Sequence, residues 1–267
     1  MERALVLFSG GQDSSTSLAW ALNQFDHVET IGFDYGQRHA IEMDCRPLIR
    51  AGMADLNPEW AERLGADHRI DVTGSFANIG STAMTQEAEF RMMESGLPNA
   101  FVPGRNLLFF TVAAAVAYRR SIRNLVGGMS QGAYPDCGDD TLKSLQVTIN
   151  LGTADNYVIH TPLMRVKRAN RWKLAEQLGG TALVELIRHD SHTCYVGDRV
   201  HWNDWGYGCG SCPACKQRAN GWEQYLSSGK NRKTSLKSDA FGGGQYLVDQ
   251  YTPSGQKQSF DNLLIEG

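Results

Sequence analysis

The chain has 267 residues, 42% of them hydrophobic, and a formal net charge of −3. This length suffices to bury a sizeable core, and the slightly acidic balance argues against a general nucleic-acid-binding surface. No stretch approaches the roughly 18 apolar residues of a membrane span, and the start "MERALVLFSGG" lacks the charged region and cleavage site of a signal peptide. We therefore expect a cytoplasmic protein with no membrane partner, built as one large α/β domain or as one domain with a small appendage.

The first predicted element is a buried strand at residues 4–8, followed by "SGGQDSS" and a helical pattern that opens at Asp13. Such a turn leaves backbone N–H groups unpaired at a helix N-terminus, where the helix dipole favours an anion. The stretch is neither a P-loop, which needs a lysine after its last glycine, nor a dinucleotide fingerprint, which needs three spaced glycines. It predicts a phosphate cradle, with an ordinary tight turn capped by Asp13 as the alternative.

Strands and helices then alternate as far as residue 188. Further strands are predicted at 28–33 (ending at Asp34), 68–72, 124–129 and 158–161, and helices after Asp34 and at 107–118, 139–151 and 172–188. This alternation indicates a Rossmann-like α/β fold, a parallel sheet with helices on both faces. Because ligands bind beyond the carboxyl ends of parallel strands, we expect the loops at 9–15, 34–39, 102–106 and 130–137 to converge on one crevice.

Four of the six cysteines lie close together in the sequence: Cys194, Cys209, Cys212 and Cys215. Four thiolates suit tetrahedral Zn²⁺, and a closed set of four leaves no open position, so the site is expected to be structural and to pin residues 195–208 onto the domain. An iron–sulfur cluster is the main alternative, and a set in which His192 replaces one cysteine is another.

The composition changes beyond Leu226 to a basic segment rich in glycine and serine, "SSGKNRKTSLKSDAFGGGQ", which predicts a linker. The final segment is expected to form two short strands around "TPSG" or a disordered tail. The predicted organisation is therefore an α/β domain at 1–188, a zinc segment at 189–226, and a linker and extension at 227–267.

Several motifs between Ala4 and Tyr225 carry a resemblance to a known family. They are "FSGGQDSS", "ETIGFDYGQRH", "LPNAFVPGRNLLF", "YPDC", "INLG", "HTPLM" and "HTCYVGD...DWGYGCGSCPACKQR". Together they resemble the 7-cyano-7-deazaguanine (preQ0) synthases of queuosine biosynthesis, the QueC family, within the ATP-pyrophosphatase (PP-loop) superfamily.

The resemblance implies an ATP-dependent C–N ligase. The carboxylate of 7-carboxy-7-deazaguanine attacks the α-phosphate of ATP, pyrophosphate leaves, and ammonia captures the acyl-adenylate as an amide. A second ATP then activates the amide, which loses AMP to become the nitrile. Such chemistry needs a fixed geometry and donors that hold pyrophosphate as its charge develops.

The resemblance also implies roles for individual residues. ATP is expected to contact the loop and the end of the second strand: Ser9, Gly10, Gly11, Asp13, Ser14 and Ser15 for the phosphates, and Phe33 and Asp34 for adenine and ribose. Asp13 either caps the helix or helps to hold Mg²⁺.

Arg38 and Arg105 are the expected cations for phosphate or carboxylate, because a guanidinium offers a planar fork, although either is alternatively a surface charge. With Asp13 they form the expected catalytic set, and Arg105 also contacts the substrate. Tyr134 and Asp136 are the expected purine readers, by stacking and by accepting from N–H groups; a plain proline turn is the alternative.

Two stretches depart from the family pattern. "SQGAYPDCG" is shorter than the usual loop and has Gly138 in place of an arginine, and "RVKRANR" puts Lys167 and Arg168 where an Asp–Lys pair is common. We expect both changes to lie near the acceptor side and to leave the ATP loop whole. They favour conjugation of the deazaguanine to a protein amine, as in QueC-like proteins of CBASS antiphage operons, over release of a free nitrile.

Other functions stay open at this point. The chain is alternatively an ordinary synthase that uses ammonia, a nucleotide-binding scaffold without turnover, or a tRNA-modifying enzyme. The acidic balance counts against nucleic acid as the direct substrate. A homodimer is compatible with the family.

Overall fold

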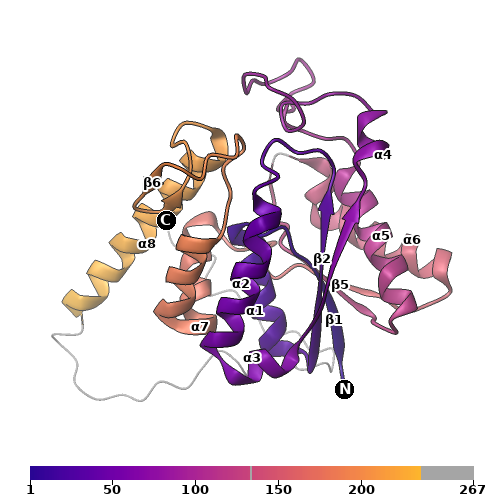
Figure 1. Ribbon diagram of the computed structural model, residues 1–267, viewed down its shortest axis with the longest axis horizontal. Helices are drawn as coiled ribbons and strands as arrows, with labels where there is room; N and C mark the ends of the chain where they lie inside the picture. The colour runs from indigo at the N-terminus through magenta and orange to yellow at the C-terminus, as the bar shows by residue number, and fades with distance from the viewer. Residues whose placement is uncertain (133, 236–267) are drawn as a thin grey trace. The chain divides into compact units, whose positions relative to one another are not determined.

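A computed structural model describes residues 1–132 and 134–235 of the chain (Figure 1). The chain divides into two units, Met1–Ser227 and Ser228–Gly267. The sequence-based domain boundaries after residues 188 and 226 stay predictions. None of the described helices is both long and apolar enough to cross a membrane.

The elements follow one another in the order expected for an α/β protein. They are β1 (Arg3–Leu7), α1 (Gln12–Gln24), β2 (His27–Asp34), α2 (Glu42–Leu56), α3 (Pro58–Arg63), β3 (Leu64–Asp71), α4 (Thr73–Ala77), α5 (Arg105–Arg119), β4 (Asn124–Gly127), the short 3₁₀ helix η1 (Pro135–Cys137), α6 (Asp139–Thr153), β5 (Val158–His160), α7 (Arg168–Asp190), β6 (Trp202–Asn203), β7 (Gly206–Tyr207) and α8 (Pro213–Ser235).

Strands β1 to β5 form one parallel sheet in the order β3-β2-β1-β4-β5. This confirms the predicted Rossmann-like fold. The strand order reverses beside β1, and in open α/β sheets ligands bind at such a point, outside the carboxyl ends of the strands. The loop after β1, which carries the phosphate-cradle motif, therefore begins at the place where the topology opens a crevice.

Helices cover both faces of the sheet: α1, α2, α3 and α7 lie on one side and α5 and α6 on the other (Figure 1). The alternation of β1 explains both cores, because Ala4, Val6 and Phe8 pack toward α1 and α7 while Leu5 and Leu7 pack toward α5 and α6. A strand buried on both faces needs apolar residues at every position, which is why β1 has a continuous apolar sequence.

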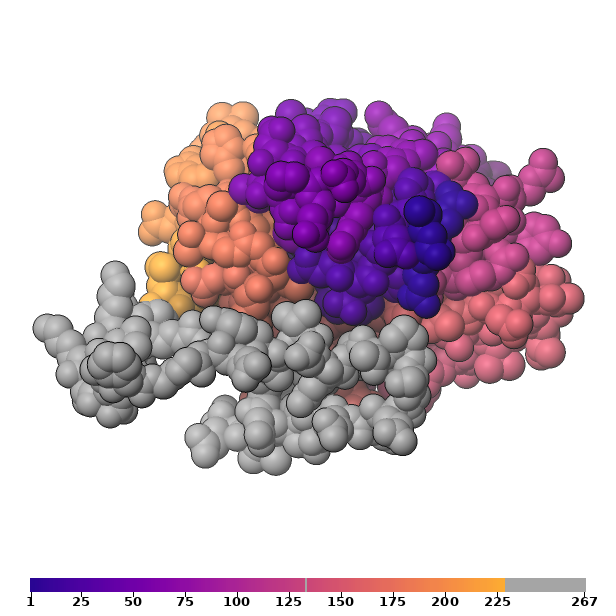
Figure 2. Space-filling model, turned by 90° about the horizontal axis from the view of Figure 1, so that it is seen from below, coloured from indigo at the N-terminus to yellow at the C-terminus, as the bar shows by residue number. Residues whose placement is uncertain are grey.

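Figure 2 shows the molecule from the amino ends of the strands, where the N-terminal residues, drawn in indigo, reach the surface. Met1 is 96% exposed at this edge. The carboxyl ends lie at the opposite edge, beneath the segment between α4 and α5 in Figure 1.

The structure corrects several predicted boundaries. Helix α1 begins at Gln12 rather than Asp13, and β3 begins four residues before the predicted position 68. Helix α7 begins at Arg168 and bends at Gly179 and Gly180, where two glycines allow non-helical backbone angles. Helix α8 continues to Ser235, so residues 227–235 of the predicted linker are helical. The predicted terminal strands lie outside the described residues.

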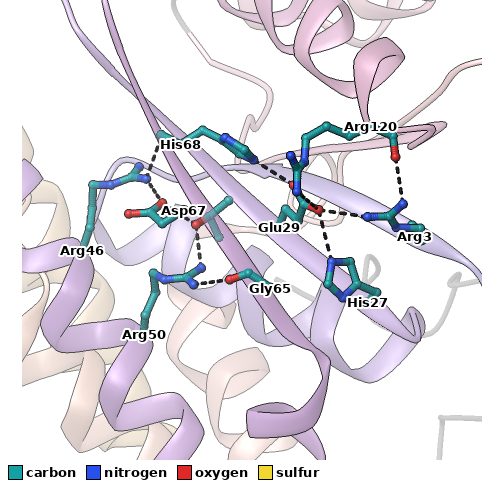
Figure 3. Close-up of polar contacts among 10 residues, drawn as sticks. Arg3, His27, Glu29, Arg46, Arg50, Gly65, Asp67, His68 and Arg120 are labelled. Atoms are coloured by element: carbon teal, nitrogen blue, oxygen red, sulfur yellow. Dashed lines mark hydrogen bonds and ion pairs between the residues drawn. The ribbon is translucent and has the colours of Figure 1, made fainter.

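The buried carboxylate of Glu29 joins side chains from strands β1, β2 and β3 through hydrogen bonds (Figure 3). Glu29 of β2 is fully buried and accepts hydrogen bonds from Arg3 (3.0 Å), Arg120 (2.9 Å from Nη2, with a second from Nε), His27 (3.2 Å) and His68 (2.8 Å). Burial by itself raises the pKa of Glu29, but the hydrogen bonds from Arg120 and the two histidines outweigh it and lower this pKa to about 2.

Candidate functional site

The loop between β1 and α1 presents unpaired backbone donors. Gly11 is the N-cap of α1 in an extended conformation, and no side chain caps the helix. Gly10 has φ +94°, and a Cβ on it would lie 2.3 Å from the carbonyl oxygen of Glu42, so the tight turn requires glycine. The free N–H groups of the first helical turn and the helix dipole make an anion site.

The serines of this loop are hydrogen-bonded to its own atoms. The Ser9 and Ser14 hydroxyls lie 3.2 Å apart, and the Gly11 N–H donates to Ser9 Oγ at 3.2 Å. Ser15 is buried and donates to the Gly11 carbonyl at 2.8 Å. Ser9 and Ser14 border a cavity beside the loop, whereas Ser15 does not border it and stabilises the loop through this hydrogen bond.

Asp13 does not cap α1, which corrects one of its two expected roles. The Asp13 carboxylate instead accepts a hydrogen bond from Arg171 Nη1 at 2.5 Å, and Arg171 Nη2 donates to Ser130 Oγ at 2.7 Å. The Asp13 side chain is 36% exposed and borders the cavity, so one part of its carboxylate faces the site. That placement leaves the second expected role, in metal binding, as a prediction.

A cavity of about 580 Å³ opens beside the loop. All four predicted loops contribute to it, which confirms the expected convergence. The predicted site residues that border it are Ser9, Gly11, Asp13, Ser14, Phe33, Arg105 and Tyr134. Those that do not border it are Gly10, Ser15, Asp34, Arg38 and Asp136. A volume of this size is in the range of small-molecule sites.

Aromatic rings form one wall. Phe33, at the end of β2, stacks on Phe109 of α5, with ring centroids 4.2 Å apart and planes within 5°. Asp34 accepts a hydrogen bond from the Gly36 N–H at 3.1 Å and shapes the following turn. Phe33, which was expected to contact adenine, is therefore one half of a stacked aromatic pair, and its partner Phe109 was not among the predicted residues.

The two predicted arginines are in different surroundings. Arg105 borders the cavity and donates to the Tyr35 hydroxyl at 3.0 Å. Burial lowers the pKa of Arg105, but Tyr35 and Asp136 outweigh it, so this pKa is raised and the guanidinium keeps its charge. Burial raises the pKa of Tyr35 to about 12. Arg38 instead donates to the Ala83 carbonyl, at 3.4 Å, and does not border the cavity.

Tyr134 and Asp136, the two residues predicted to contact the purine, also lie in different surroundings. Tyr134 borders the cavity and stacks on Phe101, with centroids 5.6 Å apart. Asp136 is buried and accepts from the Asn106 N–H at 3.1 Å, at the N-terminus of α5. Because an N-terminal helix N–H favours a carboxylate, Asp136 is engaged by α5 and does not face the cavity.

The four predicted cysteines lie together, with all four Sγ atoms within 4.8 Å of one another. An ideal tetrahedron with Zn–S bonds of about 2.3 Å sets sulfurs about 3.8 Å apart, and Cys209 and Cys215 lie 3.9 Å apart. Hydrogen bonds from Cys212 and Cys215 lower the pKa of the Cys194 thiol well below its usual range. The cluster therefore fits a single metal ion.

His192 is not a fifth member of this cluster. Its ring Nε2 lies 3.1 Å from the Cys194 carbonyl oxygen, and its backbone N–H donates to the Gly10 carbonyl at 3.0 Å. His192 thus links the cysteine cluster to the phosphate loop, which sequence spacing did not indicate.

The family model described as "Queuosine biosynthesis protein QueC" matches residues 3–226. The chain belongs to the QueC family. It is 58% identical over 228 residues to the 7-cyano-7-deazaguanine synthase of Gluconobacter oxydans, covering 84% of this chain and 94% of that protein. It is 59% identical over 228 residues to 7-cyano-7-deazaguanine synthase 2 of Sphingopyxis alaskensis, covering 84% of this chain and 96% of that protein.

This membership confirms the predicted family and the expectation of an enzyme. Among solved structures, a 4-thiouridine synthetase in complex with RNA and bound ATP is 13% identical with a TM-score of 0.47, and covers 89% of this chain and 54% of that chain. A similarity this low says nothing about function.

The basic stretch "RVKRANR" of this QueC-family chain was expected near the acceptor side, and that placement stays a prediction. Arg168 and Arg171 border the cavity, and Arg171 contacts Asp13 of the phosphate loop. The positive charge of these arginines is evident in the sequence, but the partner of Arg171 is not, because 158 residues separate Arg171 from Asp13.

Proposed function

We propose that this chain is a 7-cyano-7-deazaguanine synthase that uses ATP and ammonia to convert the carboxylate of 7-carboxy-7-deazaguanine into a nitrile. The relatives named for this activity support the proposal. The observation that carries it is the uncapped N-terminus of α1, which opens into the same cavity as Arg105. A phosphate site and a carboxylate-binding cation are then available to the two reactants at once.

The first step activates the carboxylate. One carboxylate oxygen attacks the α-phosphate of ATP, and the bond to pyrophosphate breaks. The N–H groups at the start of α1 would hold the phosphates, Phe33 and Phe109 would contact adenine, and Arg105 would orient the carboxylate. Arg171 borders the same cavity and would stabilise the negative charge that develops on pyrophosphate.

The second step forms the C–N bond. Ammonia attacks the acyl carbon, AMP leaves with the electron pair of the broken C–O bond, and an amide results. The amide oxygen then attacks the α-phosphate of a second ATP and a second pyrophosphate leaves, after which loss of AMP and two protons gives the nitrile. Using the same cavity twice is reasonable, because both activations place an oxygen of the substrate against an α-phosphate.

Two metal ions complete the proposal. Asp13 would contribute to a Mg²⁺ site, and Mg²⁺ would offset phosphate charge when ATP is bound. Zn²⁺ would bind Cys194, Cys209, Cys212 and Cys215 and stabilise the fold of this segment. Metal analysis of the purified chain is expected to give one zinc per chain, and iron with the absorption of a cluster would contradict this assignment.

Ammonia is a better-supported acceptor than a protein amine. The relatives are named for synthesis of the cyano compound, and nothing in them points to conjugation or to antiviral defence. The case for a protein acceptor rested on the shorter loop and on the basic stretch "RVKRANR", and Arg171 of that stretch contacts Asp13 of the phosphate loop. The shorter loop around Gly138 remains unexplained.

The test is mass spectrometry of the full chain with 7-carboxy-7-deazaguanine, ATP and Mg²⁺, with and without ammonium. The expected result is free nitrile only with ammonium, together with AMP and pyrophosphate. Amide that does not proceed to nitrile, or no pyrophosphate release that depends on the deazaguanine, would contradict the proposal.

A further inference from the structure

A buried histidine and glutamate border the cavity and have no role in the steps above. His39 lies in the turn before α2, and Glu42 is the first residue of α2. They are 6% and 8% exposed, and His39 Nε2 lies 3.4 Å from Glu42 Oε1. Both residues border the cavity in which the substrates would bind.

The imidazole of His39 is incompletely paired. Its Nδ1 is buried and has no hydrogen-bond partner among the described residues. The 3.4 Å separation on the other side of the ring is longer than an ordinary hydrogen bond. An unpaired buried nitrogen costs free energy and calls for an explanation, and catalytic hydrogen bonds often tighten only when substrate is bound.

The pair lies between the two halves of the proposed site. On the phosphate side, the backbone carbonyl of Glu42 packs against Gly10, where a Cβ would lie only 2.3 Å away. On the other side, the His39 ring lies 6.4 Å from the ring of Tyr35, whose hydroxyl accepts from Arg105. In the proposed function the acyl carbon would lie between the phosphate loop and Arg105, since its oxygens would contact both.

From this placement we infer that His39 is the general base of amine capture and that Glu42 balances the charge His39 acquires; the inference rests on the proposed function. The nitrogen of ammonia bonds to the acyl carbon, and the C–O bond to AMP breaks with its electron pair on AMP. The proton that the nitrogen loses goes to the imidazole of His39. The imidazolium lies beside the Glu42 carboxylate, which stabilises it until the proton passes to solvent.

The experiment separates activation from amine capture in the full chain. Exchange of labelled pyrophosphate into ATP, in the presence of 7-carboxy-7-deazaguanine, reports adenylation and needs no amine. Amide formation with ammonium reports capture. In His39→Asn we expect exchange to persist and amide formation to fall about 100- to 10,000-fold, the usual contribution of a general base. His39→Gln is the second variant in case the first does not fold, as judged by thermal unfolding.

Hydroxylamine distinguishes a base from a structural histidine. It is far less basic than ammonia, so it needs less help to lose a proton. We expect His39→Asn and Glu42→Gln to lose much less activity with hydroxylamine than with ammonium. A structural role would lower both reactions equally. His189→Asn is the matched control, because His189 forms a similar pair with Asp190 at 2.9 Å but is exposed and does not border the cavity.

The outcomes are distinct. Amide formation at the wild-type rate in His39→Asn, or equal losses with both amines, would overturn the inference and leave the proposed function intact. Loss of pyrophosphate exchange in a folded His39→Asn would also overturn it, because His39 would then act in activation. Wild-type chain without exchange that depends on the deazaguanine would overturn the proposed function and the inference with it.

Discussion

The carboxylates of Glu29 and Asp13 both bind arginine, yet their surroundings differ. Glu29 is fully buried and accepts from four side chains, two arginines and two histidines (Figure 3). Asp13 accepts from Arg171 alone among the described side chains, and the buried Nε of Arg171 has no hydrogen-bond partner among the described residues. The first cluster lies in the sheet and the second beside the cavity.

The difference shows how one kind of interaction serves two purposes. In the Glu29 cluster, hydrogen bonds within the protein occupy the carboxylate, so it has no acceptor left for a ligand. The cluster therefore contributes to the stability of the fold. The pair of Asp13 and Arg171 has an unpaired donor and a partly exposed carboxylate. Such a pair can exchange hydrogen-bond partners when a charged ligand binds. Changes to Glu29 should therefore affect folding, and changes to Asp13 or Arg171 should affect catalysis.

The largest expected effect is at Asp13. Asp13→Asn keeps the shape of the side chain but removes the charge that faces Arg171 and the phosphate loop. Pyrophosphate release that depends on 7-carboxy-7-deazaguanine is expected to fall about 1,000-fold, which is the scale for loss of one strong electrostatic contact at a reacting centre. Steady-state kinetics measure it. Activity within a few-fold of wild type would place Asp13 with Glu29 as a structural carboxylate.

Glu29→Gln tests the other side of the comparison. The substitution leaves Arg3 and Arg120 beside a neutral amide, and because these side chains are 32% and 38% exposed, water offsets part of the loss. We expect the free energy of unfolding to fall by about 2–3 kcal/mol, with activity per folded molecule unchanged. Denaturant unfolding measures it. The matched control is Glu59→Gln at an exposed pair with Arg63, expected to change this free energy by about 0.5 kcal/mol or less.

The same cluster predicts a pH dependence of stability. The pKa of Glu29 is lowered from 4.5 to about 2 in the folded chain, so its contribution is fully present above pH 4.5 and is lost as the pH falls toward 2. The difference in unfolding free energy between wild type and Glu29→Gln should therefore lose most of its value of about 2–3 kcal/mol over this interval. Unfolding curves at a series of pH values measure it, and a difference that stays constant would mean that Glu29 does not titrate as described.

The smallest expected effect is that of Arg171→Lys. Lysine keeps the charge but cannot contact Asp13 and Ser130 at once through a planar fork. We expect KM for ATP to rise about 10-fold, with a smaller change in kcat. Arg165→Lys is the control, because Arg165 lies in the same stretch and is 76% exposed. An unchanged KM would mean that Arg171 only supports the structure.

Local sequence patterns predicted the architecture well. The five strands, their parallel arrangement and the convergence of the loops followed from the alternation of apolar strands with amphipathic helices. The glycine turn and the clustering of the four cysteines could also be predicted from the sequence, because each depends on residues close together in the chain. Gly10 and the cluster from Cys194 to Cys215 are of this kind.

Residue roles that depend on distant partners were harder to predict. Arg38 and His39 are neighbours in one motif, yet Arg38 bonds to the Ala83 carbonyl and His39 borders the cavity. Asp136 has the chemistry of a purine reader, but the N-terminus of α5 engages it. Neither outcome has a signal in the local sequence.

The sequence by itself therefore determined the fold, the phosphate loop and the cysteine cluster, because hydrophobic periodicity, glycine conformation and thiol spacing act over a few residues. Only the tertiary structure decided which charged side chains meet in the cavity. Asp13 meets Arg171, and the local pair of His39 and Glu42 shares the cavity with Arg105, because α2, α5 and α7 pack around one edge of the sheet. Packing directs each of these side chains, so residue type alone does not reveal its partner.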